Sequence, residues 1–231
     1  MAKIAGMDGA RGQWCAVMFD TKTGAYQAQI VGALGELLAM PNAPEIIAID
    51  IPIGLPDVVG PGGRQCEATA RQLLGRPRAS SVFSAVGRCA LRAPDRATAD
   101  RVHREHGGIG IGSHAWAIKE KLIAIDNEMT PKRQRVVHEV HPEVTFWAMA
   151  DGRAMAHRKK SAPGRNERRE ILLQHMPEQF LNVLPLGAAW DDYFDACAAV
   201  WTGQRILNGA AVRLPANVGL DPLGLDMAIW Y

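Results

Sequence analysis

Residues 45–54 read EIIAIDIPIG, and this stretch decides the fold class. The apolar residues before Asp50 do not alternate with polar ones, which is typical of a strand covered on both faces in a parallel or mixed sheet. Pro52 and Gly54 then end the strand. A carboxylate in this position is costly to remove from water unless a partner compensates it. Because strand ends form the ligand crevice of open α/β sheets, Asp50 is a candidate site residue.

Three short strands are predicted before this stretch. Apolar runs at 3–7 (KIAGM) and 14–19 (WCAVMF) are joined by DGARGQ, a turn-rich linker of hairpin length, and a third strand is predicted at 25–31. A short helix is predicted at 34–40, ahead of the central strand at 45–51. We expect the first three strands to form an antiparallel meander.

The rest of the chain alternates helices with short strands. Helices are predicted at 64–74, 94–106, 113–128, 166–175 and 191–207, and strands at 135–140 and 228–231. Ser113 is expected to cap its helix, and Pro142 to open a helix after the strand at 135–140. This order predicts a single α/β domain over residues 1–231 with a mixed sheet, flanking helices and a basic helical insertion at about 57–130.

Composition places the chain among ordinary globular proteins. Its 231 residues are 48% hydrophobic and 22% charged, which excludes a disordered or fibrous chain. The four cysteines form no C-x-x-C pair, so we expect free thiols rather than a zinc site. There is no apolar stretch of membrane-spanning length, and the first residues lack the apolar core of a signal peptide. We therefore expect a cytoplasmic protein that binds no membrane, with a homodimer left open.

The formal net charge of +2 hides an uneven distribution. Residues 64–104 hold nine Arg against three acids, and residues 153–169 hold seven Lys or Arg against one acid, so each segment carries +6 and the remainder −10. Cations of this density suit a phosphate backbone, so DNA or RNA is a predicted partner; solvated helix faces are the alternative. The candidate contacts are Arg71, Arg78, Arg88, Lys159, Lys160, Arg165 and Arg168.

Five acidic residues are candidates for catalysis: Asp8, Asp50, Glu139, Asp192 and Asp195. Asp192 and Asp195 are three apart on one face of the predicted last helix. Each acid also has a structural interpretation: a turn at Asp8-Gly9, a helix cap at Asp192, a surface strand position at Glu139. Carboxylates that converge repel one another, and a divalent cation removes that repulsion. We therefore expect Mg²⁺ or Mn²⁺ to be held by the four aspartates.

At these residues the sequence resembles the domain-of-unknown-function family 429, whose members are predicted nucleases of the RNase H-like fold. The resemblance covers nearly the whole chain, and its motifs are specific as a set. The matching stretches are GMDGARGQW at 6–14, AIDIPIGLP at 48–56, RQCEATARQLLGRPRASSVF at 64–83, HEVHPEVTFWAM at 138–149, KKSAPGRNERREILL at 159–173 and DDYFDACAAVWTGQRI at 191–206.

The resemblance implies a five-stranded sheet with three antiparallel strands, then two parallel ones. RNase H-like nucleases place one Asp on the first strand, an acid at the end of the fourth strand and one or two acids on the last helix. By that pattern Asp8 and Asp50 are the strand residues, and Asp192 and Asp195 lie on the helix. Glu139 has no such counterpart and is a candidate from its strand alone.

The leading hypothesis is a divalent-metal-dependent nuclease that hydrolyses phosphodiesters of DNA or RNA. Two alternatives remain: a noncatalytic nucleic-acid-binding protein of the same fold, and an ATP-dependent phosphotransferase, whose duplicated architecture needs about twice this length. His141 is a candidate for assisting a metal or a proton transfer, or for packing. Ser80 and Ser81 have no neighbouring base, so phosphate contact or a turn is favoured over a nucleophile.

Overall fold

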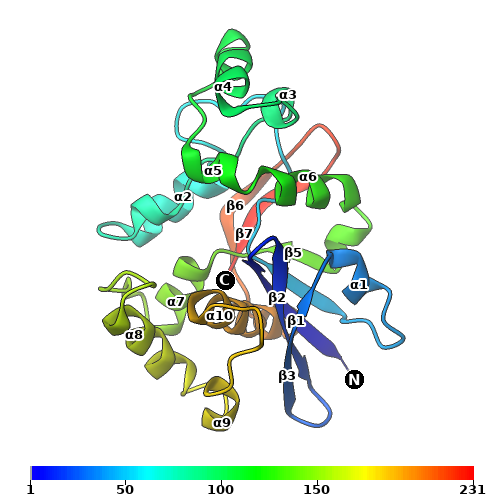
Figure 1. The fold of residues 1–231 in the computed structure, drawn as a ribbon, viewed down its shortest axis with the longest axis vertical. Helices are drawn as coiled ribbons and strands as arrows, with labels where there is room; N and C mark the ends of the chain where they lie inside the picture. The colour runs from blue at the N-terminus through cyan, green and yellow to red at the C-terminus, as the bar shows by residue number, and fades with distance from the viewer. Residues whose placement is uncertain (1) are drawn as a thin grey trace.

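The centre of the protein is a mixed five-stranded sheet with strand order β3-β2-β1-β4-β5 (Figure 1). The computed structural model describes residues 2–231. The strands are β1 (Lys3–Ala10), β2 (Gln13–Asp20), β3 (Ala25–Val31), β4 (Ile46–Ile49) and β5 (Val137–Glu139). The first three are antiparallel, and β4 and β5 run parallel to β1. The predicted α/β fold with this mixed sheet is confirmed.

Ten α-helices of the described residues surround the sheet. They are α1 (Leu34–Leu38), α2 (Gln65–Leu74), α3 (Arg88–Leu91), α4 (Arg96–Glu105), α5 (Ser113–Ala117), α6 (Lys119–Glu128), α7 (Pro142–Met149), α8 (Ala162–Leu172), α9 (Glu178–Leu181) and α10 (Trp190–Leu207). Apolar residues of α1 and α6 cover one face of the sheet, and those of α10 cover the other. The helix predicted to open at Pro142 is α7.

Helix α10 packs closely across β1, β4 and β2. The close approach depends on Gly6 in β1, because a Cβ atom there would overlap the backbone at Ala196 and Val200 of α10. Helix α10 also packs against other helices: Tyr193 and Phe194 of α10 are buried in one apolar cluster with residues of α7 and α8. The sheet therefore holds α10 in a fixed position along β1.

Helices α2–α6 lie between β4 and β5 in the sequence and rise beyond the carboxyl ends of the strands (Figure 1). Buried residues of α3–α6 belong to the same apolar cluster as those of α1 and one sheet face. A second, two-stranded sheet of β6 (Arg213–Leu220) and β7 (Asp226–Trp230) packs against α2. The α2–α6 segment is thus joined to the central domain on two sides.

The first hairpin differs from the prediction. The linker DGARGQ was expected to be the turn, yet β1 continues to Ala10 and the turn consists of Arg11 and Gly12 alone. Both have positive φ, 40° and 85°, the backbone that suits the twist of a two-residue hairpin. Asp8 therefore lies inside the strand, opposite Cys15, and the prediction of a turn at Asp8-Gly9 is wrong.

Smaller differences from the prediction concern single helices and strands. The single helix predicted at 113–128 is two helices that break at Ile118, and Gly112 rather than Ser113 is the N-cap. The strand predicted at 228–231 is β7, which begins at Asp226, and its partner β6 was not predicted.

The four cysteines are free, as expected. Among the described residues, no helix combines the length and apolar character needed to cross a membrane.

Candidate metal centre

Three aspartates meet at the carboxyl end of the central strands. Oxygens of Asp8, Asp50 and Asp195 all lie within 4.8 Å of one another. The register explains two of them: Met7 of β1 pairs with Ile49 of β4, so the next residues, Asp8 and Asp50, lie side by side. Asp195 comes from the second turn of α10, which packs against both strands. The structure thus brings together three of the four aspartates expected to hold a metal.

Burial makes this carboxylate cluster electrostatically costly. Asp8 and Asp195 are 7% and 1% exposed, and Asp50 is half-buried. Burial, together with the negative charges of Asp50 and Asp195, raises the pKa of Asp8 well above its usual range. Burial also raises the pKa of Asp50 to about 7, although Lys159 opposes the shift. The three groups hold their charges only if positive charge lies close by.

Lys159 supplies part of that positive charge. Its Nζ lies 2.5 Å from Oδ2 of Asp195. Burial alone would lower the pKa of Lys159, but the nearby Asp195, Asp8 and Asp50 outweigh burial and raise it. One ammonium against three carboxylates leaves a formal charge of −2 when all are ionised. The cluster therefore remains short of positive charge.

The donor set fits a hard divalent cation. Oδ1 of Asp195 is buried and has no hydrogen-bond partner, which is a costly state for a carboxylate oxygen. Carboxylate oxygens from Asp8 and Asp50 complete a set of the kind that Mg²⁺ and Mn²⁺ take, together with water and phosphate. An ion bonded to Oδ1 of Asp195 would satisfy that atom and neutralise the remaining charge.

A cavity of about 610 Å³ lies against this cluster. Its walls hold Asp50 and Asp195, four cations, two serines, an aromatic pair and the start of α7. The lining residues are Asp50, Arg78, Ser80, Ser81, Phe83, His114, His141, Pro142, Glu143, Arg158, Lys159, Lys160 and Asp195. Negative and positive groups thus share one cavity, which is the arrangement needed to place a phosphate next to a metal.

Two residues that line the cavity each have a buried atom without a hydrogen-bond partner: Nδ1 of His141 and Oε2 of Glu143. Glu143 is 6% exposed, and its other oxygen, Oε1, accepts a hydrogen bond from Arg168 at 2.5 Å. Burial lowers the pKa of His141, which favours its neutral form. The sequence analysis did not single out Glu143; its signal was an acid directly after the helix-opening Pro142, two residues beyond His141.

Glu139 lies outside the carboxylate cluster. Its two oxygens accept hydrogen bonds from Arg64 at 2.6 and 2.9 Å, and Oε2 also accepts one from the backbone of Ile53 at 2.7 Å. Burial raises the pKa of Glu139 to about 6, against the effect of Arg64. These contacts tie β5 to the loop after β4, so Glu139 anchors the structure beside the cluster.

Asp192 also lies apart from the three clustered aspartates. It is half-buried in the first turn of α10, and burial, followed by the charge of Asp191, raises its pKa. Asp192 and Asp195 share a helix face as predicted, but Asp195 is one turn closer to the strand ends. Asp192 is thus a neighbour of the cluster and not one of its three members.

Several predicted nucleic-acid contacts are internal arginines. Arg71 donates to the backbone of Val82 and Gly62 and to Ser84. Arg88 pairs with Asp126 and Asp221, and Arg168 with Glu143. Each of these guanidinium groups makes hydrogen bonds within the fold, so the alternative of a fully solvated helix face does not describe them.

Of the remaining four predicted contacts, three line the cavity, whereas Arg165 lines a separate hollow beside Trp190 and Phe194. Lys159, Lys160 and Arg78 line the cavity, and the Arg78 guanidinium also donates to the backbone of Met155 and Ala156. Lys160 is exposed, and half-buried Arg165 follows it in α8. Arg158, which the sequence analysis did not single out, is exposed and lines the cavity as well.

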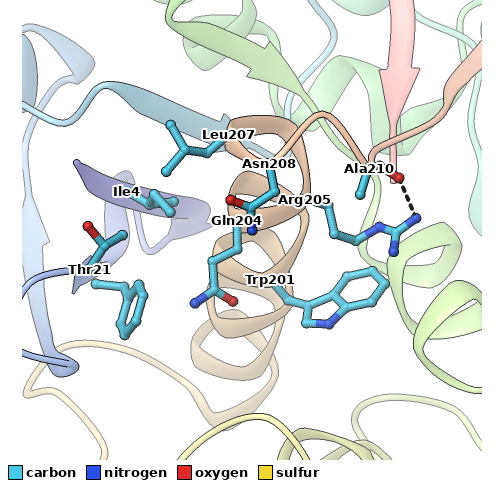
Figure 2. Close-up of a pocket in the computed structure, with 9 residues that line it drawn as sticks. Ile4, Thr21, Trp201, Gln204, Arg205, Leu207, Asn208 and Ala210 are labelled. Carbon is cyan, nitrogen blue, oxygen red and sulfur yellow. Dashed lines mark hydrogen bonds between the residues drawn. The ribbon is translucent and has the colours of Figure 1, made fainter. Parts of the chain in front are cut away.

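A second hollow, of about 460 Å³, lies at the opposite end of α10 (Figure 2). Figure 2 shows Trp201, Gln204 and Arg205 of the last turns of α10 around it, with Ile4 at the start of β1. The Arg205 guanidinium donates to the backbone of Ala210 at 2.7 Å. None of its lining residues is acidic, so it offers no comparable metal site.

Comparison with known proteins places the chain in a family. No curated protein and no solved structure matches it. The model of one family, described as "Protein of unknown function (DUF429)", matches residues 6–219, a range that includes Asp8, Asp50 and Asp195. This match extends over nearly the whole chain and agrees with the resemblance noted in the sequence. The chain belongs to the DUF429 family.

Proposed function

We propose that this chain is a divalent-metal-dependent nuclease, which hydrolyses phosphodiester bonds of DNA or RNA at the carboxylate cluster. The observation that carries the proposal is the meeting of Asp8, Asp50 and Asp195 within 4.8 Å, beside a cavity with four cations on its walls. Acids alone would repel a phosphate, and cations alone would only bind it. Their combination in one cavity suits metal-assisted cleavage of a polyanion.

The protein groups have distinct roles in this proposal. Asp8, Asp50 and Asp195 hold the metal, which when bound activates a water molecule and stabilises the leaving oxygen. Lys159 lies 2.5 Å from Asp195 and offsets part of the negative charge of the cluster until a metal ion binds. Arg158 and Lys160 lie exposed on the cavity wall, where they draw the phosphate backbone toward the cluster.

The sheet supports an RNase H-like assignment within this proposal. Its order, with three antiparallel strands followed by two parallel ones, is the one that such nucleases share. The acids also lie where that fold places them: on β1, directly after β4, and on the last helix. Fold alone does not give an activity, so the carboxylate cluster is the main support.

The test is cleavage of single-stranded, branched and RNA–DNA hybrid substrates with Mg²⁺ or Mn²⁺. We expect cleavage by the natural protein, and loss of at least a hundredfold in Asp50→Asn, which removes a metal ligand while keeping the side-chain shape. Glu170→Gln, at an exposed position on α8, is the matched control and should retain activity. Absence of cleavage by the natural protein, or full activity of Asp50→Asn, would refute the proposal.

One observation favours a second function. Because Lys159 already pairs with Asp195, the cluster has a resident cation, which suits a noncatalytic nucleic-acid-binding protein of this fold. That function predicts salt-sensitive binding that survives the loss of Asp8 and Asp50, with no turnover. The same cleavage assay, run beside a binding assay, separates the two functions.

A further inference from the structure

We propose that the cavity beside the carboxylate cluster binds an unpaired nucleotide, so that the substrate is single-stranded nucleic acid. The inference rests on the proposed nuclease function and adds its substrate class. Three features carry it: an aromatic pair on the cavity wall, a carboxylate of the wall with an unpartnered oxygen, and the depth of the carboxylate cluster.

The aromatic pair consists of Phe83 and His114. Their ring centroids are 5.1 Å apart, the rings are tilted by 60°, and both line the cavity. Phe83 is half-buried and packs against the apolar core, which fixes its position, whereas His114 is exposed. Burial and the positive charges of Lys159 and Lys160 lower the pKa of His114, which favours the neutral ring. Such rings bind unpaired bases by stacking, with little dependence on sequence.

The unpartnered acceptor on Glu143 favours a ligand with hydrogen-bond donors over a bare phosphate. Oε2 of buried Glu143 accepts no hydrogen bond, and a carboxylate is satisfied only by a donor or a cation. A phosphodiester group has no donor, but the sugar hydroxyls and the base amino groups of a nucleotide do. His141, whose Nδ1 is also unpartnered, lies in the same wall. The cavity therefore suits a ligand that combines phosphate, a ring and hydrogen-bond donors.

The depth of the cluster disfavours a paired duplex. Asp8 and Asp195 are 7% and 1% exposed. The α2–α6 segment extends over the strand ends (Figure 1). Phe83, between α2 and α3, and His114, in α5, belong to this segment. A cavity of about 610 Å³ has the size of a small-molecule site, and a paired base must leave its stack to enter such a site. A single strand pays no such cost. Arg158 and Lys160, both exposed, can pair with phosphates on either side of the bound nucleotide.

The experiment measures binding and cleavage separately. A fluorescein-labelled octanucleotide, a blunt duplex of the same sequence and a nucleoside monophosphate are titrated with the natural protein in Ca²⁺, and cleavage is followed in Mn²⁺. The variants are Phe83→Ala, Phe83→Tyr, which restores a ring, and His114→Ala, whose exposed position leaves the core intact. His106→Ala, at an exposed histidine in the turn after α4, is the matched control.

We expect the octanucleotide to bind at least tenfold more tightly than the duplex. Phe83→Ala and His114→Ala should each weaken its binding about tenfold, while Phe83→Tyr and His106→Ala bind normally. Equal binding of duplex and single strand, unchanged binding in both alanine variants, or a mononucleotide that binds as tightly as the strand would each overturn the inference. Cleavage that depends on Asp50 but not on the rings refutes this inference alone. Binding that depends on the two rings, without any cleavage, refutes the proposed nuclease function and leaves the binding inference standing.

Discussion

Lys159 is the residue that balances the cluster while no other cation is bound. Its Nζ lies 2.5 Å from Asp195, and the neighbouring Asp8 and Asp50 also help to raise its pKa. An ammonium satisfies one carboxylate oxygen well, but it leaves Oδ1 of Asp195 without a partner. Lys159 and a divalent ion therefore compete for the same negative charge, and the lysine sets the affinity of the cluster for metal.

We expect Lys159→Met to bind Mn²⁺ about tenfold more tightly than the natural protein, because a competing cation is removed. Calorimetric titration with Mn²⁺ measures this change. Lys160→Met is the matched control, since the Lys160 side chain is 82% exposed and lies 3.9 Å from Asp191. Weaker Mn²⁺ binding in Lys159→Met would show that the lysine supports the metal rather than competing with it.

Asp50 makes the stability of the metal-free protein depend on pH. Its pKa is raised to about 7, so the folded chain holds this proton more tightly than the unfolded chain does. The corresponding stability is fully present below about pH 4 and is lost as pH rises through 7. We expect Asp50→Asn to gain on the order of 2 kcal/mol relative to the natural protein between pH 5 and pH 8. Urea unfolding in EDTA at pH 5 and at pH 8 measures this gain. If the unfolding free energies of Asp50→Asn and the natural protein differ by the same amount at both pH values, the prediction is contradicted.

At the scale of elements, the contact between β1 and α10 positions Asp195 against Asp8. A side chain at Gly6 would overlap the backbone of α10 at Ala196, the residue after Asp195. We expect Gly6→Ala to destabilise the fold by about 2–4 kcal/mol, within the range of overpacked cores, and to weaken Mn²⁺ binding. Gly60→Ala is the control, because a Cβ there meets no atom within 4 Å and its φ is not positive. Unchanged stability of Gly6→Ala would show that α10 can shift without loss.

A buried ion pair joins α7 to α8. Arg168 and Glu143 are 1% and 6% exposed, and they meet at 2.5 Å. We expect Arg168→Met to lose about 3–5 kcal/mol of unfolding free energy, because it leaves a buried carboxylate uncompensated. Adding Glu143→Gln should recover part of the loss. Arg169→Met breaks an exposed pair with Glu178 and should cost no more than about 1 kcal/mol in the same denaturation experiment.

The sequence predicted those elements whose pattern is local. An unbroken apolar run placed Asp50 at a strand end, and the three-residue spacing placed Asp195 on a helix face. The partner of Glu139 could not be predicted, since Arg64 is 75 residues away in the sequence. The partners of the internal arginines could not be predicted either, because the sequence of a basic segment does not show whether its cations face solvent or another segment. Strand β6 was missed because Pro215 and Gly219, which are both unusual inside strands, interrupt the apolar alternation of its sequence RLPANVGL.

At the scale of the whole molecule, only part of the charge of the two basic segments borders the cavity. Arg71, Arg88 and Arg168 are engaged in internal contacts, and the cations that line the cavity are Arg78, Arg158, Lys159 and Lys160. The apparent +12 of the two segments therefore overstates the charge that a nucleic acid would meet. Binding should be local, over a few nucleotides, rather than along an extended groove.

This distribution predicts a shallow salt dependence. With three or four phosphate contacts, the slope of log K against log salt for a single strand should be about −2 to −3. Titration of a labelled octanucleotide in Ca²⁺ between 50 and 200 mM salt measures the slope. A value near −8 would mean that many more cations take part, and that the internal arginines are released on binding.

The order of the three clustered aspartates along the chain has a consequence for biosynthesis. Asp8 and Asp50 leave the ribosome well before Asp195, which comes 145 residues after Asp50 in the sequence. A nascent or prematurely terminated chain that lacks α10 has two of the three acids and exposes the sheet face that this helix covers. The proposed activity can thus begin only after α10 has been synthesised, so a nascent chain that has not reached this helix could not act on the messenger RNA from which it is read.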